Sequence, residues 1–290
     1  MDIFYASVNG VLLGGLYALY GLGLALTFGI MRTINLAHGD MIVFGSFMSL
    51  VVTRVLGLPA LASLVVLIPA MFLLGRLFQE RVMNRSLGEG IMPSIILTFG
   101  LSVVIQNALL LTFSADRQTL SAGQLQTMSL PLTEDFAIGV LPLMTLCVVI
   151  VLLIALNWFF RHTMLGRAFR ATSDDPEVVA LMGIDPRRTY GLAMGLAFAI
   201  IAITGVFMGL RTNFAPFDGP ARLIFAFEVI IIGGMGSIQG VLIGGVILGV
   251  AQTMGNLVNP AFFQLSGHVA TLLVLAIRPS GLFPETIERD

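Results

Sequence analysis

The chain has 290 residues, of which 57% are hydrophobic and only 11% are charged, whereas a soluble domain carries about a quarter charged residues. This composition excludes both a water-soluble fold and an intrinsically disordered chain. The fifteen basic residues are all arginine, so this chain has no lysine for a phosphate-binding P-loop or for Schiff-base chemistry. A net charge of −1 gives no electrostatic basis for binding nucleic acid.

Long windows without charge predict helices that cross a membrane. Such a helix needs about 20 mainly apolar residues. Window 33–53 holds only Asp40, and stretch 223–277 holds only Glu228. Continuous apolar runs favour helices over barrel strands, in which apolar and polar residues alternate. We therefore expect an all-α, polytopic membrane bundle of about eight transmembrane helices, or nine if residues 223–277 hold three pieces around the glycines at 233–236. The windows without any Asp, Glu or Arg are 3–31, 55–75, 90–115, 136–160 and 189–210.

Arginine placement predicts the orientation of these helices. The loops after stretches 3–31, 55–75 and 136–160 hold more arginine than the loops after 33–53, 90–115 and 189–210. Because cytoplasmic loops carry the excess of basic residues, we place the richer loops in the cytoplasm and the N-terminus outside. Residues 1–290 then form one transmembrane domain, and 161–188 is its longest cytoplasmic loop.

Three polar residues lie at the start of the second window: Asn35, His38 and Asp40. His38 and Asp40 are two residues apart, which is a poor spacing for joint metal binding on a helix, so we expect no metal site. Two interpretations remain open. The three residues hold an irregular helix start by local hydrogen bonds, or they contact a substrate in a transport pathway.

The loop 161–188 contains one short helix with clear start and stop signals. These are an N-cap, a proline at the first helical position, an acid at the positive end of the helix dipole and a terminating glycine. Because a helix of about seven residues is not stable alone, it must dock on its own protein or in a groove of a partner. In chain order the residues are Asp175, Pro176, Glu177, the apolar face Val178, Leu181 and Met182, and Gly183.

The stretch 223–277 combines repeated glycines with a single acid, Glu228. Small residues four apart let helix backbones approach closely. Glu228 is costly near the bilayer centre, so a place near the outer membrane surface, a subunit contact and a pathway role all remain open. We expect His268 to be a satisfied core histidine rather than a proton relay. The glycines with this spacing, which we expect to pack helices, are Gly236, Gly240 and Gly244, and Gly245 and Gly249.

Four sequence blocks, in this order, resemble the permease subunits of ABC importers for branched-chain amino acids. The first is INLAHGD at 34–40, followed by FGS at 44–46. The second, GRA at 166–168 through ALMGI at 180–184, is similar to the cytoplasmic coupling segment of these permeases. The others are GGMGSIQG at 233–240 and RPSGLF at 278–283.

The resemblance implies partners and a cellular location. Such permeases lie in the bacterial inner membrane and work with a second, related permease as a heterodimer. Two ATPase subunits use ATP and Mg, and a periplasmic protein binds the substrate. The helix at 176–182 would then dock on an ATPase, together with Gly166 and Arg170. This chain itself would hold no catalytic residue and no cofactor.

The expected function is therefore ATP-driven import of amino acids by alternating access, with branched-chain amino acids as the family's substrates. One alternative is an ABC permease for urea or another small organic solute. A second is an ion-coupled secondary transporter, for which the candidate ionisable groups are scattered along the sequence. A membrane-embedded enzyme would need a motif such as H-E-x-x-H or G-x-S-x-G, and neither occurs.

Overall fold

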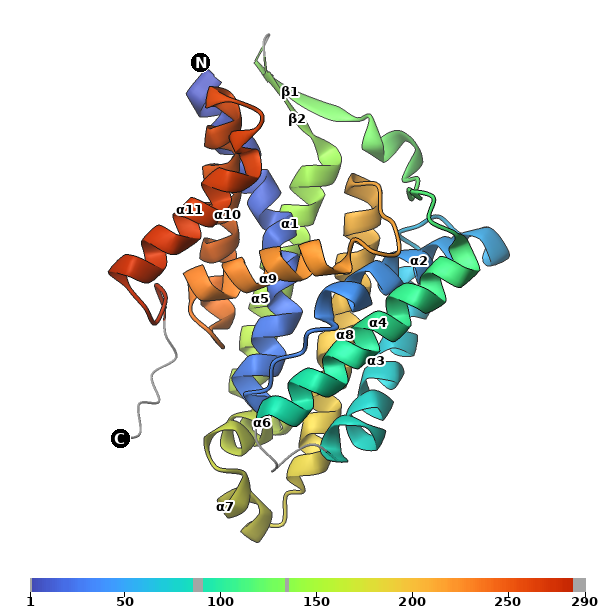
Figure 1. Cartoon of the computed structure of the whole chain (residues 1–290), viewed down its shortest axis with the longest axis vertical. Helices are drawn as coiled ribbons and strands as arrows, with labels where there is room; N and C mark the ends of the chain where they lie inside the picture. Colours follow the sequence, from blue (N-terminus) through green and yellow to red (C-terminus); the bar gives the residue numbers. More distant parts are fainter. Residues whose placement is uncertain (1, 86–90, 134–135, 284–290) are drawn as a thin grey trace. The chain divides into compact units, whose positions relative to one another are not determined.

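The computed structural model describes residues 2–85, 91–133 and 136–283, which are mostly helical (Figure 1). Two short 3-10 helices and one antiparallel hairpin, β1 (Ser129–Thr133) with β2 (Phe136–Gly139), are the exceptions in this part of the chain. The helices are α1 (Asp2–Met31), α2 (His38–Leu56), α3 (Leu64–Arg81), α4 (Ile91–Phe113), α5 (Val140–His162), α6 (Met164–Asp174), α7 (Pro176–Leu181), α8 (Pro186–Arg211), α9 (Gly219–Gly233), α10 (Ile238–Val258) and α11 (Phe262–Ile277).

Six of the described helices, α1, α2, α4, α5, α8 and α10, are long and apolar enough to cross a membrane. The chain is thus a polytopic helical membrane protein, which confirms the predicted fold class. Stretch 223–277 holds three helices, as in the nine-piece alternative. Gly234 and Gly236, with φ of 107° and 86°, separate α9 from α10 in a backbone conformation that favours glycine.

Window 55–75 differs from the prediction of one continuous helix. Gly57 ends α2 with a φ of 66°, and turns around Pro59 occupy the following residues. α3 begins only at Leu64, contains Pro69 and extends past the apolar window to Arg81.

The chain divides into two compact units. The first contains Met1–Ala25, Gly123–Leu153 and Phe225–Asp290, and the second contains Leu26–Ala122 and Ile154–Ile224. In the second unit α8 is the central element, since α2, α3 and α6 all pack against it. Glycines allow these close contacts: a methyl group at Gly195 would lie 2.9 Å from the carbonyl oxygen of Phe72.

In the first unit, glycines of α1 face glycines of α10. A Cβ at Gly245 would lie 2.5 Å from the carbonyl oxygen of Gly14, and one at Gly249 would lie 2.3 Å from that of Gly10. These distances leave no room for a side chain, so the two backbones are in contact.

Two further glycines that we predicted to pack helices, Gly240 and Gly244, lie close to α9. A Cβ at Gly240 would lie 2.2 Å from the carbonyl oxygen of Gly233, and one at Gly244 would lie 2.2 Å from that of Val229. Gly236 lies instead in the turn before α10, where its positive φ rather than a helix contact requires glycine.

We predict that Gly249→Ala lowers the melting temperature of the purified protein, because the added methyl group overlaps the backbone of α1. Overpacking of this kind costs about 1–3 kcal/mol. Gly100→Ala on α4 is the matched control, since nothing lies within 4 Å of its added Cβ and alanine favours a helix interior by about 1 kcal/mol. Equal melting temperatures for the two variants would contradict the backbone contact.

Candidate functional site

The predicted coupling segment of the second unit folds as two short helices, α6 and α7. The side chain of Asp175 caps α7 by accepting the N–H groups of Glu177 and Val178, both at 3.1 Å. Gly183 follows the helix with a φ of 84°, which is the left-handed conformation of a helix-terminating glycine. The short helix therefore lies where its capping residues predict it.

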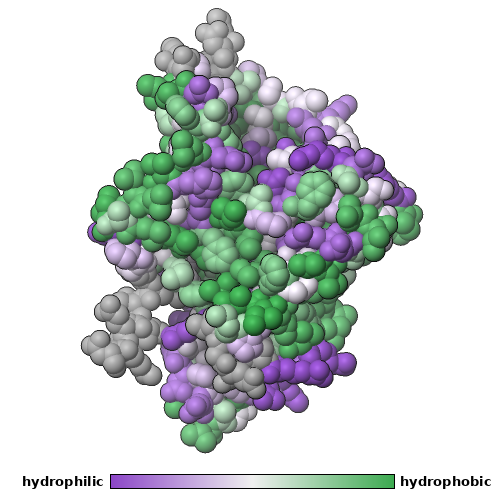
Figure 2. All heavy atoms as spheres, in the orientation of Figure 1, coloured by the Kyte–Doolittle hydropathy of each residue, from purple (hydrophilic) through white to green (hydrophobic). Residues whose placement is uncertain are grey.

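An exposed apolar face runs along α7. Val179 is 4% exposed and holds the helix on its own unit, whereas Leu181 is 89% exposed and Met182 77%. At the end of the molecule where Figure 1 labels α7, Figure 2 shows apolar atoms among hydrophilic ones. We call the exposed residues Met164 and Leu165 of α6 with Val178, Leu181 and Met182 the α6–α7 apolar face.

Three contacts hold α6 in place. Thr163 caps α6 by accepting the N–H of Gly166 at 2.9 Å, and a Cβ at Gly166 would lie 2.3 Å from the carbonyl oxygen of Phe159. The hydroxyl of Ser173 donates to the carbonyl oxygen of Gly29 at 2.6 Å. Gly166 is therefore buried and positions α6, whereas Arg170 is exposed.

The predicted pathway residues Asn35, His38 and Asp40 are buried in the second unit. The side chain of Asn35 accepts the N–H of Ala37 at 3.0 Å, in the non-helical segment before α2. His38 and Asp40 begin α2 and are each 1% exposed. This local geometry matches an irregular helix start held by hydrogen bonds.

Asp40 joins three helices. Its Oδ2 accepts the hydroxyl of Ser102 at 2.6 Å, and its Oδ1 accepts the amide of Gln106 at 2.9 Å, both from α4. A Cβ at Gly219, the first residue of α9, would lie 1.9 Å from Oδ1. Both carboxylate oxygens thus have donors, and the first turn of α9 packs directly on the carboxylate.

Sequence reasoning missed the partners of Asp40. They belong to a stripe of polar residues at every fourth position of α4, all on the side that packs against the protein. Thr98 in this stripe accepts the N–H of Leu36 at 3.1 Å. The regular spacing within an otherwise apolar window was the signal that could have identified them. The stripe consists of Ser94, Thr98, Ser102 and Gln106.

In the first unit, Glu228 of α9 meets His268 of α11. Glu228 is 6% exposed, and its Oε1 hydrogen bonds with Nδ1 of His268. The side chain of His268 is 44% exposed, so it is paired but lies at the surface of the unit rather than in its core. Glu228 and His268 are 40 positions apart in the sequence, and α9 and α11 bring them together.

A second buried polar pair lies in the same unit. The hydroxyl of Tyr17 in α1 donates to the side-chain oxygen of Gln252 in α10. The ring of Tyr17 also lies 5.1 Å from that of Phe225 in α9. Neither Tyr17 nor Gln252 stands out in the sequence, since each is one polar residue in an apolar window.

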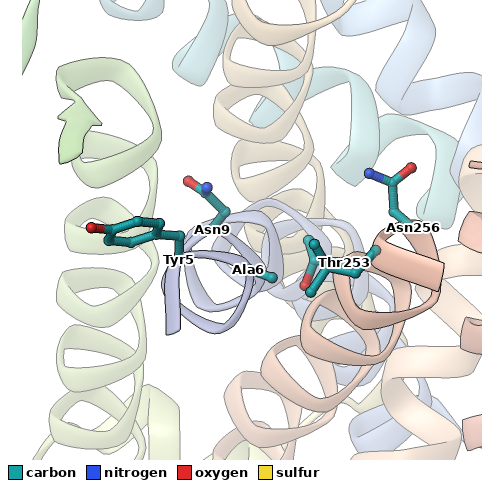
Figure 3. A pocket seen from close by; sticks show the side chains of 6 residues that line it. Tyr5, Ala6, Asn9, Thr253 and Asn256 are labelled. Atoms are coloured by element: carbon teal, nitrogen blue, oxygen red, sulfur yellow. The ribbon is translucent and has the colours of Figure 1, made fainter. Parts of the chain in front are cut away.

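Residues of α1 and α10 line a shallow pocket of about 300 Å³. Figure 3 shows Ala6 and Thr253 pointing toward each other across it. Asn9 and Asn256 add amide groups, and no lining residue carries a formal charge. Elsewhere in the described residues, no group of three or more His, Cys, Asp or Glu side chains is placed to hold a metal ion.

Comparison with known proteins identifies relatives along almost the whole chain. Residues 6–277 match the family described as the branched-chain amino acid transport system permease component. The high-affinity branched-chain amino acid transport system permease protein BraD of Pseudomonas aeruginosa is 29% identical, and the alignment covers 95% of this chain and 94% of BraD.

Two permease proteins of Escherichia coli K12 that carry the same description also match. LivH is 28% identical over 94% of this chain and 93% of its own length. LivM is 27% identical over 50% of this chain and 34% of its own length. No solved structure matches the chain.

We predict that Ser102→Ala lowers the melting temperature of the purified protein, because it removes one of the two side-chain donors to the buried carboxylate of Asp40. Loss of such a hydrogen bond costs about 1–3 kcal/mol. Thr112→Ala on the same helix is the control, since its exposed hydroxyl bonds only to the backbone of α4. The network is not a stabilising one if both variants melt at the temperature of the unmodified protein.

Proposed function

Because the chain belongs to the branched-chain amino acid transport permease family, we propose that it forms the membrane passage of an ATP-driven amino acid importer and is moved by an ATPase docked on its α6–α7 apolar face. The family and the six apolar helices make it a multi-pass permease of the inner membrane. Its proposed substrates are branched-chain amino acids, the class named for its relatives.

The α6–α7 apolar face is the observation that carries this proposal. Exposed apolar side chains on a helix inside the membrane are expected. α7, however, follows the charged residues Asp174 and Asp175 and contains Glu177 in its first turn, and these three residues favour water. Leu181 and Met182 are almost fully exposed there. Burying each in a groove of a partner would contribute about 1.5–3 kcal/mol, so the face suits a helix-in-groove contact.

The packing of the second unit supports transmission of motion from this face. α6 and α7 contact α8, and α8 packs against α2 and α3. Ser173 also ties α6 to the end of α1 through the carbonyl oxygen of Gly29. ATP binding would close the ATPase pair, and rigid-body movement of α6 and α7 would carry that motion to the membrane helices.

The remaining partners are proposed from the relatives and the composition. LivH and LivM of one organism are both permeases of a branched-chain amino acid system, and both are similar to this chain. This supports a heterodimer with a second, related permease. The chain has no lysine for a P-loop, which agrees with binding of ATP and Mg by other chains. The resemblance to ABC importers implies that these are two ATPase subunits and that a periplasmic binding protein delivers the substrate.

We predict that replacing Val178, Leu181 and Met182 together by Asp abolishes both uptake and co-purification of the ATPase, while the permease still inserts into the membrane. The three carboxylates would have to enter an apolar groove without partners. Arg188→Gln is the control, since it changes the charge of an exposed residue outside the apolar face. If the ATPase stays bound to the triple variant, the docking assignment is wrong.

We further predict that uptake stops when ATP is removed but continues when the proton gradient is collapsed. The measurement is uptake of radiolabelled leucine into proteoliposomes with ATP enclosed, with and without an ionophore. Glu228 with His268 is the one acid–histidine side-chain contact among the described residues, so it is where a proton-coupled mechanism would act. Uptake that requires the gradient and not ATP would favour the secondary transporter.

A further inference from the structure

We infer that Glu228, His268, Gln252, Tyr17 and Phe225 form a substrate site, closed in this structure, that holds the charged head and the apolar side chain of an amino acid. We call these five residues the polar cluster of the first unit. This inference rests on the proposed function, because it names the place in the passage where the permease contacts its substrate.

Four helices of the first unit bring the cluster together. Tyr17 of α1 donates to Gln252 of α10 and packs its ring against Phe225 of α9. One turn further along α9, Glu228 pairs with His268 of α11. Gly267, the neighbour of His268, lies against Gln252, since a Cβ there would be 2.8 Å from Nε2 of the amide.

Two buried polar atoms of the cluster have no hydrogen-bond partner among the described residues. They are Oε2 of Glu228 and Nε2 of Gln252, and Gln252 is fully buried. Buried polar groups are nearly always paired, and those that are not call for an explanation such as a functional role. Because one atom is a carboxylate acceptor and the other an amide donor, they complement the ammonium and carboxylate groups of an amino acid.

The rest of the cluster matches the remainder of such a substrate. The rings of Tyr17 and Phe225, with centroids 5.1 Å apart, offer an apolar surface to a branched side chain. An ammonium group also interacts favourably with aromatic faces. The cluster thus provides an acceptor for a cation, a donor for an anion and an apolar wall.

Two other polar places fit an amino acid less well. Asp40 in the second unit already accepts a hydrogen bond at each carboxylate oxygen. The pocket in Figure 3 has no charged lining residue for either end of a zwitterion. Of Asp40 and Glu228, only Glu228 therefore has a carboxylate oxygen without a hydrogen-bond donor among the described residues.

The partial exposure of His268 suggests how the site opens. In this structure the imidazole occupies one carboxylate oxygen of Glu228. Small residues form the neighbouring contact of α10 with α11, since a Cβ at Gly255 would overlap the side chain of Ser266. Movement of α11 away from α9 would separate His268 from Glu228 and free the carboxylate for the ammonium group of the substrate.

The test uses the complete importer, with both permeases, the ATPases and the binding protein, in proteoliposomes. Glu228→Gln and Gln252→Met change charge and hydrogen bonding with little change of shape. For each we expect leucine uptake per ATP hydrolysed to fall by about tenfold or more, the usual effect of losing one hydrogen bond to a charged group. ATP hydrolysis stimulated by the binding protein should stay at the wild-type level, because the cluster lies outside the α6–α7 apolar face.

The control is Asn107→Leu, which removes an exposed amide of α4 that bonds only within its own helix. A wild-type ratio of uptake to hydrolysis in both cluster variants overturns the inference, and so does a parallel loss of uptake and hydrolysis. If either variant does not assemble, the ratio of uptake to hydrolysis is measured for Tyr17→Phe instead. It removes only the hydroxyl that holds Gln252, and an unchanged ratio then overturns the inference. Failure of the unmodified importer to use ATP would instead contradict the proposed function.

Discussion

The rest of this structure depends on one constraint: inside a bilayer, polar groups must find their partners within the protein. Helices meet this requirement for the backbone but leave side chains to be paired between helices. Pairing needs close approach, and the glycines of α1 and α10 provide it, since the carbonyl oxygens of Gly10 and Gly14 lie where side chains at positions 249 and 245 of α10 would stand. Dense glycine is thus part of how this chain keeps a few polar residues in an apolar interior.

Asp40 meets this constraint, since both of its carboxylate oxygens have hydrogen-bond donors within the protein. A carboxylate in this environment is costly, and α4 supplies two neutral donors while α9 places a glycine directly against it. The same α4 stripe also binds the backbone at Leu36, so it holds the non-helical segment before α2 in place.

α7 shows the opposite case. Its apolar residues are exposed beside charged ones, where burying them in a partner is favourable and exposure to water is not.

Features set by neighbouring residues could be predicted from the sequence, and features set by distant ones could not. The limits of α7 follow from Asp175, Pro176 and Gly183 alone, and the break between α9 and α10 follows from clustered glycines. A break at Asn259 and Pro260 separates α10 from α11. Pro260 is a local signal for this break, but the apolar stretch continues across it without a charged residue. The pairing of Glu228 with His268 had no local signal, because two helices packed in three dimensions decide it.

Polar residues whose hydrogen bonds are all formed and polar residues with an unpaired atom have different roles in a transporter. A network such as that of Asp40 stabilises one arrangement of helices and resists change. A transporter must also hold its substrate briefly and release it, which requires polar groups whose bonding is incomplete until the substrate arrives. The unpaired atoms of Glu228 and Gln252 meet this requirement at some cost in stability, and the scarcity of charge elsewhere limits how many such places the chain can have. In the substrate site that we propose, low charge content and transport function are therefore connected, because few polar groups of this chain can be left available for a ligand.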